Sequence, residues 1–93
     1  MLSMHFQIQF LERMSLYLTS GISLLEALRI VASGQPQPLA AAAQRIEASV
    51  RAGQPFWSAC NDTKTLNSNS VGLVRVGEVS GSLPSSLQRA SES

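Results

Sequence analysis

Apolar residues recur at steps of three and four positions along the first part of the chain. This spacing is the period of an amphipathic α-helix, in which such residues share one face. The pattern predicts a first helix from Met4 to Ser20. Its apolar residues are Phe6, Phe10, Met14, Tyr17 and Leu18.

Two further helices are predicted in the middle of the chain. Ser23 followed by Glu26 has the spacing of a capping box, in which each side chain satisfies the other residue's backbone N–H, so a second helix starts near Leu24. Pro38 suits the first position of a third helix, because the N–H that proline lacks has no helical partner there. This third helix ends at Gly53.

The last part of the chain predicts three shorter helices. Residues 55–60 can form a brief fourth helix, and the polar residues 61–65 are expected to be exposed. A fifth helix is predicted from about residue 67 to residue 79, with Val71 and Val74 on one face, although these valines would also suit a strand. Gly81 ends it, and Ser82 caps a final helix.

A glycine followed by a helix-opening residue occurs three times. Gly21, Gly53 and Gly81 each close one helix, and a Ser or Pro opens the next. Short turns of this kind fold neighbouring helices back on each other. Residues 1–93 are therefore predicted to form a single all-α domain, a compact antiparallel bundle of about six helices.

Composition narrows the possible functions. Charged residues make up only 14% of the chain, against roughly 25% in ordinary soluble domains, which indicates burial against a partner. The basic residues are spread out and nearly cancelled by acidic ones, and a net charge of +1 argues against a nucleic-acid partner. No apolar run approaches the ~20 residues that span a bilayer, so membrane contact is expected only through segments absent from this chain.

The sequence offers no catalytic, cofactor-binding or metal site. Cys60 has no Cys or His at ligand spacing and is expected to be a buried, unreactive core thiol in a reducing compartment. His5 has no nucleophile and orienting acid placed near it. Ser23 and Ser82 are interpreted as helix caps, not nucleophiles. An enzyme is therefore not predicted.

Two stretches of the sequence resemble one known family. Residues 18–29 are similar to its helix–glycine–helix opening and contain Gly21, Ser23, Leu24 and Leu28. Residues 73–83 resemble its Gly-Glu-x-Ser-Gly-x-Leu signature, with Gly77, Glu78, Ser80, Gly81 and Leu83. Gly53 falls where the family ends its third helix with a glycine. The family is the type II secretion system F domain, which occurs in inner-membrane platform proteins of type II secretion and type IV pilus systems.

The resemblance implies a six-helix, non-catalytic, protein-interaction domain on the cytoplasmic side of the bacterial inner membrane. It also implies two related copies in the full-length protein, and membrane helices outside this chain. The implied partners are the assembly ATPase and inner-membrane proteins of the secretion or pilus machine. No cofactor is implied.

Several residues have more than one interpretation. The Glu78 carboxylate can contact a partner or accept hydrogen bonds from N–H groups at the start of the last helix, and the second role is favoured. Gly77 most simply lets two helices approach closely, although it can also expose backbone to a ligand. Of the neighbours Phe56 and Trp57, at least one is expected in the core.

The first helix also predicts self-association as a two-fold dimer. The chain is too small to bury every apolar side chain of that helix, and the interface would use Phe6, Phe10, Met14 and Tyr17. A different class of function is the alternative, a small helical DNA-binding regulator. Helix pairs joined by a short turn, such as the pair around Gly21, also occur in helix-turn-helix proteins.

Overall fold

The computed structural model describes residues 2–93, which form six α-helices and no strand. The predicted all-α bundle of six helices is confirmed. The helices are α1 (Met4–Thr19), α2 (Leu24–Ala32), α3 (Gln37–Arg51), α4 (Phe56–Asp62), α5 (Ser68–Ser80) and α6 (Leu83–Glu92). Pro38 is the second residue of α3, not the first as predicted, because the preceding Pro36 is its N-cap.

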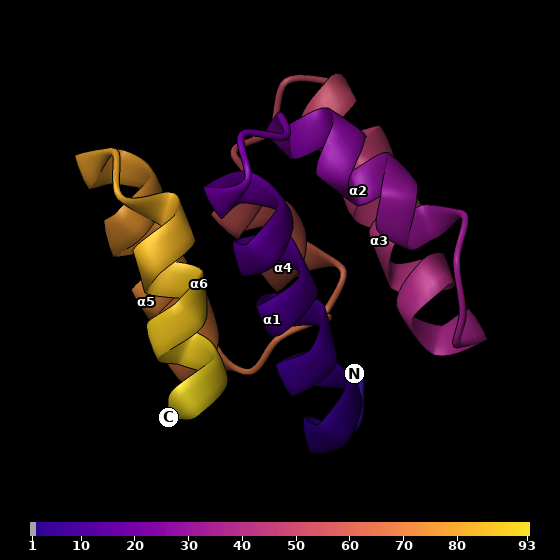
Figure 1. Cartoon of the computed structure of the whole chain (residues 1–93), viewed down its shortest axis with the longest axis horizontal. Helices are drawn as coiled ribbons and strands as arrows, with labels where there is room; N and C mark the ends of the chain where they lie inside the picture. The colour runs from indigo at the N-terminus through magenta and orange to yellow at the C-terminus, as the bar shows by residue number, and fades with distance from the viewer. Residues whose placement is uncertain (1) are drawn as a thin grey trace.

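The helices pack as a closed ring in chain order. Each contacts the next one along the chain, and α6 returns to contact α1. Figure 1 shows the α2–α3 pair on one side, the α5–α6 pair on the other and α1 between them, with α4 behind α1. Because α1 and α6 run in opposite directions, the two ends of the chain lie at the same end of the bundle (Figure 1).

The core lies inside this ring. The rings of Phe10 in α1 and Phe56 in α4 stack there with their centroids 6.4 Å apart, and both side chains are fully buried. The other helices contribute Leu28 (α2), Ile46 (α3), Val74 (α5) and Leu87 (α6) to the core, each with 0% exposure. Each helix has one apolar stripe, and in the ring these stripes face one another, so that they are buried together.

Left-handed glycines end three of the helices, as the sequence predicted. Gly21, Gly53 and Gly81 have φ angles of +92°, +109° and +79°. Glycine adopts this region without the steric penalty that a Cβ brings, so the chain can reverse directly after a helix. The reversals bring the residues of the family signature to the junction of α4, α5 and α6.

Candidate functional site

Gly77 is a point of close packing between α5 and α6. A Cβ at this position would collide with the Cβ and Oγ of Ser86 on α6, and Ser86 is itself completely buried. The Ser86 Cβ is fixed to its backbone, so the two helices would have to separate. The structure thus supports close helix packing as the role of Gly77.

Glu78, on the next position of α5, caps a different helix from the one predicted. Its two carboxylate oxygens accept hydrogen bonds from the backbone N–H groups of Phe56, at 2.9 Å, and Trp57, at 2.8 Å. These are the first two residues of α4, not of the last helix. The prediction that Glu78 caps the start of a helix was correct, but the predicted helix was wrong, because the sequence does not show that α4 packs against α5.

Arg75, one turn before Glu78, holds the same end of α4. Its guanidinium lies 4.5 Å from the centroid of the Trp57 ring, a cation–π contact. Trp57 is half-buried and its neighbour Phe56 is fully buried, so the expectation that at least one of the two lies in the core is confirmed. Sequence reasoning missed Arg75, because nothing local connects it with an aromatic residue 18 positions earlier.

The turn after α5 contains the remaining signature residues. Gly81 has its positive φ, and the N–H of Ser82 donates to the carbonyl of Gly77 at 2.8 Å. Ser82 occupies the N-cap position of α6, but its side chain makes no capping hydrogen bond; its Oγ lies 2.9 Å from Ser80 Oγ instead. The predicted cap by the Ser82 side chain is therefore wrong. Leu83 is partly buried against the core.

At the start of α2 only half of the predicted capping box forms. Ser23 Oγ accepts from the N–H of Glu26 at 3.2 Å, whereas the Glu26 carboxylate pairs with Arg29 at 3.1 Å. Leu28 is fully buried and Leu24 packs partly against the core. The residues of this first family stretch thus shape the fold of α1 and α2.

The self-association face predicted on α1 is corrected by the structure. Phe10 and Met14 are 0% exposed within a single chain, and Phe6 and Tyr17 are partly buried against the same core. The prediction assumed that a small chain could not cover these side chains, but α1 is one helix of a closed ring, and Phe10 and Met14 face the core that the ring encloses. Phe10 and Met14 are therefore not available to a second copy.

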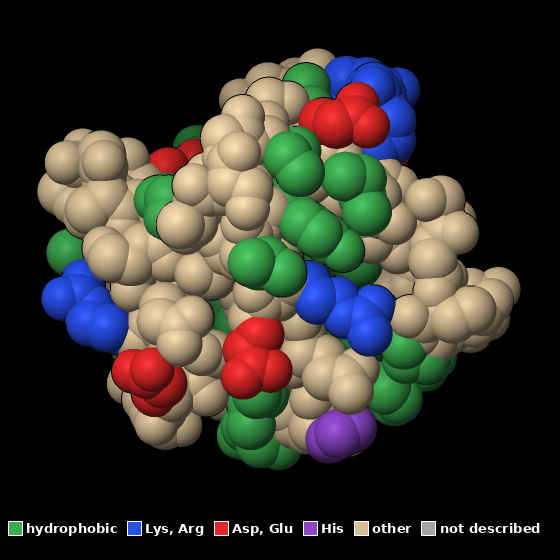
Figure 2. Space-filling model, viewed as in Figure 1, with side chains coloured by type: hydrophobic (Ala, Val, Ile, Leu, Met, Phe, Trp, Pro, Cys, Tyr) green, Lys and Arg blue, Asp and Glu red, His purple; other side chains and the backbone are tan. Residues whose placement is uncertain are grey.

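Other apolar side chains are exposed instead. They are Met4, Leu16, Val76 and Val79, with exposures of 56%, 62%, 62% and 77%. Val76 and Val79 lie on one face of α5, and Gly72, one turn earlier, has open space where a Cβ would be. Figure 2 shows hydrophobic side chains gathered over α2 and the adjoining end of α1, whereas charged groups are scattered over that face.

A buried glutamine was also missed. Gln7 is 3% exposed; its Nε2 donates to the Leu2 carbonyl at 2.8 Å, and its Oε1 accepts from the N–H of Asn67 at 3.0 Å. Asn67 Oδ1 in turn caps α5 by accepting from the N–H of Ser70 at 2.8 Å. The sequence could have indicated this burial, because Gln7 lies one turn before the core residue Phe10 and therefore on the same face of the first helix.

The titratable groups form no reactive constellation in residues 2–93. Burial raises the pKa of the Cys60 thiol, and the nearby Glu78 charge raises it further, so the thiolate is disfavoured. His5 is exposed, and its Nε2 lies 3.1 Å from Gln9 Nε2. No group of three or more metal-ligating side chains gathers among the described residues.

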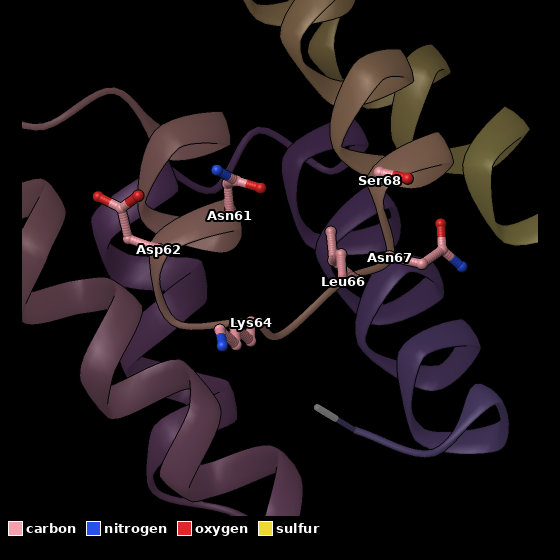
Figure 3. Close-up of a pocket in the computed structure, with 6 residues that line it drawn as sticks. All are labelled: Asn61, Asp62, Lys64, Leu66, Asn67 and Ser68. Atoms are coloured by element: carbon pink, nitrogen blue, oxygen red, sulfur yellow. The ribbon is translucent and has the colours of Figure 1, made fainter.

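A hollow of about 680 Å³ lies between the end of α4 and the start of α5. Six residues line it: Asn61, Asp62, Lys64, Leu66, Asn67 and Ser68. Figure 3 shows the side chains of Asp62 and Asn67 pointing to opposite sides rather than toward one another. Apart from Leu66 the lining residues are polar, and Asp62 and Asn67 do not converge on one point as the polar groups of a typical small-molecule site do.

Comparison with known proteins decides the family. The sequence model of the family described as "Type II secretion system (T2SS), protein F" matches residues 10–93, which is most of the chain. The chain belongs to the type II secretion system protein F family. A comparison with curated proteins found no match. As a member of the protein F family, the chain is a domain of a secretion or pilus platform protein.

Proteins of the F family are inner-membrane components of these machines. Within residues 2–93, no helix has the combined length and apolar character that crossing a bilayer requires. Three signature residues of this F-family domain make contacts or turns that shape the fold: Gly77 admits α6, Glu78 caps α4 and the exposed Gly81 reverses the chain.

Proposed function

We propose that this F-family domain is a non-catalytic protein-interaction domain on the cytoplasmic side of the inner membrane. Its partners are the assembly ATPase and inner-membrane proteins of the secretion or pilus machine. The family match over residues 10–93 is the observation that carries this proposal. The contacts of Gly77 and Glu78 support it, because a domain whose signature residues join its helices to one another is suited to positioning other proteins.

Self-association as a two-fold dimer remains part of the proposal, on a different surface. With Phe10 and Met14 in the core, the exposed face of α5 around Val76 and Val79 takes the place of the face predicted on α1. Sedimentation of the chain over a wide concentration range tests this. A concentration-dependent dimer that Val79→Asp weakens is expected, and a monomer at the highest concentration contradicts it.

The DNA-binding alternative is not proposed. Arg29 pairs with both Glu26 and Glu47, at 3.1 and 3.3 Å, and Arg51 pairs with Glu47 at 2.7 Å. Two of the seven basic residues are thus partnered, and six acidic residues leave the chain a net charge of only +1. Binding to a nucleic acid depends on cations that are free to neutralise phosphates.

The function is tested in cells by replacing residues in the gene that encodes the domain. Val79→Asp places a charge on the exposed α5 face and is expected to reduce secretion or pilus assembly at an unchanged protein level. Ala48→Asp is the matched control, because Ala48 is also exposed but lies on α3. If both variants support full assembly, the α5 face is not a contact surface of the machine. Loss of ATPase co-purification with Val79→Asp would identify the partner.

A further inference from the structure

The helix α4 depends on the rest of the molecule more than any other. It has seven residues, its N-cap is Pro55, and no side chain of its own caps it. No acidic residue stabilises its first turn and no basic residue its last. Isolated helices shorter than about 12 residues are marginal in water, so α4 is ordered by tertiary contacts.

One turn of α5 supplies the contacts that hold the start of α4. Glu78 accepts from the N–H groups of Phe56 and Trp57 at 2.9 and 2.8 Å, and the Arg75 guanidinium lies 4.5 Å from the Trp57 ring. After the helix ends, the chain passes through Lys64, whose φ of 55° is uncommon for a residue with a side chain. These contacts of Glu78 and Arg75 with α4 are therefore at its N-terminal end, whereas its apolar burial, through Phe56, Ala59 and Cys60, runs along the helix.

Cys60 lies on the inner side of α4. Its side chain is 0% exposed, as are those of Phe56 and Ala59 on the same helix. A reagent can therefore reach the thiol only when α4 moves away from the core.

The other helices remain connected without α4. The contacts of α6 with α5 and α1, and those among α1, α2 and α3, do not involve it. Removing α4 opens the ring at one point and leaves a continuous chain of packed helices. Proteins commonly open through such local units at a lower free energy than global unfolding.

We infer that Glu78 is a latch that controls a local release of α4. When its carboxylate leaves the two N–H groups, α4 detaches and exposes Cys60 while the other five helices stay folded. The inference goes beyond the proposed function and does not depend on it.

Thiol labelling of the 93-residue chain tests the latch, because Cys60 is its only cysteine. The probe is an aromatic disulfide reagent, used where the labelling rate is proportional to reagent concentration, so that the rate reports the open population. In the wild type, the free energy of opening derived from the labelling rate should change less steeply with urea concentration than the free energy of global unfolding measured by circular dichroism. Glu78→Gln, which loses the charge and one acceptor oxygen, should label about tenfold faster. Arg75→Ala should label about two- to fivefold faster.

Ser23→Ala is the matched control. It removes the cap of α2, so it destabilises the whole fold without touching α4. If α4 opens alone, its labelling rate stays at the wild-type value. Loss of the cap should raise the population of the globally unfolded chain about fivefold. If the labelling rate of Ser23→Ala also rises about fivefold, Cys60 is exposed only when the whole chain unfolds, and the inference is overturned. If Glu78→Gln does not fold, the labelling rates of Arg75→Ala and Ser23→Ala still test the inference: the first should rise and the second should not.

Discussion

The starts of α2 and α4 are stabilised in different ways. The cap of α2 comes from within the helix start itself, where Ser23 Oγ accepts from the N–H of Glu26, three residues on. The cap of α4 comes from Glu78, whose partner Phe56 lies 22 positions away in sequence. A local cap forms wherever its helix forms, whereas a distant cap exists only when two helices have docked. The second kind therefore couples the order of α4 to the position of α5.

The same contrast extends to the helix pairs around these two starts. At the surface of the α2–α3 pair, one ion pair, Arg29–Glu47, joins the two helices, and each of its residues also pairs within its own helix, Arg29 with Glu26 and Glu47 with Arg51. Both arginine side chains are more than half exposed. The α5–α6 pair is joined by direct backbone approach at Gly77. Exposed ion pairs add little to stability, whereas a close helix contact fails if any atom is added to it. Substitutions in the two regions should therefore differ widely in effect.

The largest effect is expected at Gly77. Gly77→Ala places a Cβ against Ser86 and should lower the free energy of unfolding by about 3 kcal/mol, the upper end of the usual cost of overpacking. Gly72→Ala, on the same helix with open space around it, should instead raise stability by about 0.5–1 kcal/mol. Urea unfolding of both variants measures these changes. Equal gains at both sites would mean that helix propensity, not contact with α6, governs both.

Glu78→Ala is expected to have the next largest effect. It leaves the N–H groups of Phe56 and Trp57 without their charged acceptor, and the free energy of unfolding should fall by about 2 kcal/mol. Water reaches part of this half-buried site, which keeps the loss below that of two fully buried hydrogen bonds. A loss no larger than that of an ordinary exposed glutamate, with Glu12→Ala as the comparison, would contradict the capping role.

The features of this structure that depend on neighbouring residues could be predicted from the sequence, and those that depend on contacts between distant residues could not. Helical period, Gly21, Gly53, Gly81 and the Ser23 cap are all encoded within a few residues, and the helices and turns were predicted from them. The partner of Glu78 and the stacking of Arg75 on Trp57 depend on how helices dock, which no local pattern specifies. Likewise, Phe10 and Met14 are buried because the ring of helices closes around them. The sequence does not show this closure, so the prediction that these residues form a self-association face was wrong.

Ser23→Ala tests the local cap. Its removal leaves the N–H of Glu26 to water and should cost about 1 kcal/mol, roughly half the loss at Glu78. Ser23→Asp, which keeps an acceptor at the same position, is the control and should restore most of the stability. Thermal unfolding of the three proteins provides the measurement. A loss that equals or exceeds that of Glu78→Ala would remove the distinction between local and distant caps.

The smallest effect is expected at Arg51. Its Nη2 lies 2.7 Å from Glu47 Oε2, but Arg29 reaches the same oxygen at 3.3 Å, and more than half of each arginine side chain is exposed. Arg51→Ala therefore removes one of two cations from a carboxylate that keeps the other. The free energy of unfolding should fall by about 0.5 kcal/mol or less, because solvent and salt screen exposed pairs.

A double-mutant cycle with Glu47→Ala separates this ion pair from the packing of the arginine stem. Its coupling energy should be a few tenths of a kcal/mol at low salt and should vanish near 1 M salt, where the screening length is about 3 Å. Glu78→Ala should lose the same stability at both salt concentrations, since its hydrogen bonds are short and partly shielded from solvent. Salt thus distinguishes the two regions directly. A coupling at Arg51 that persists in high salt would mean that the α2–α3 surface is also held by desolvated contacts.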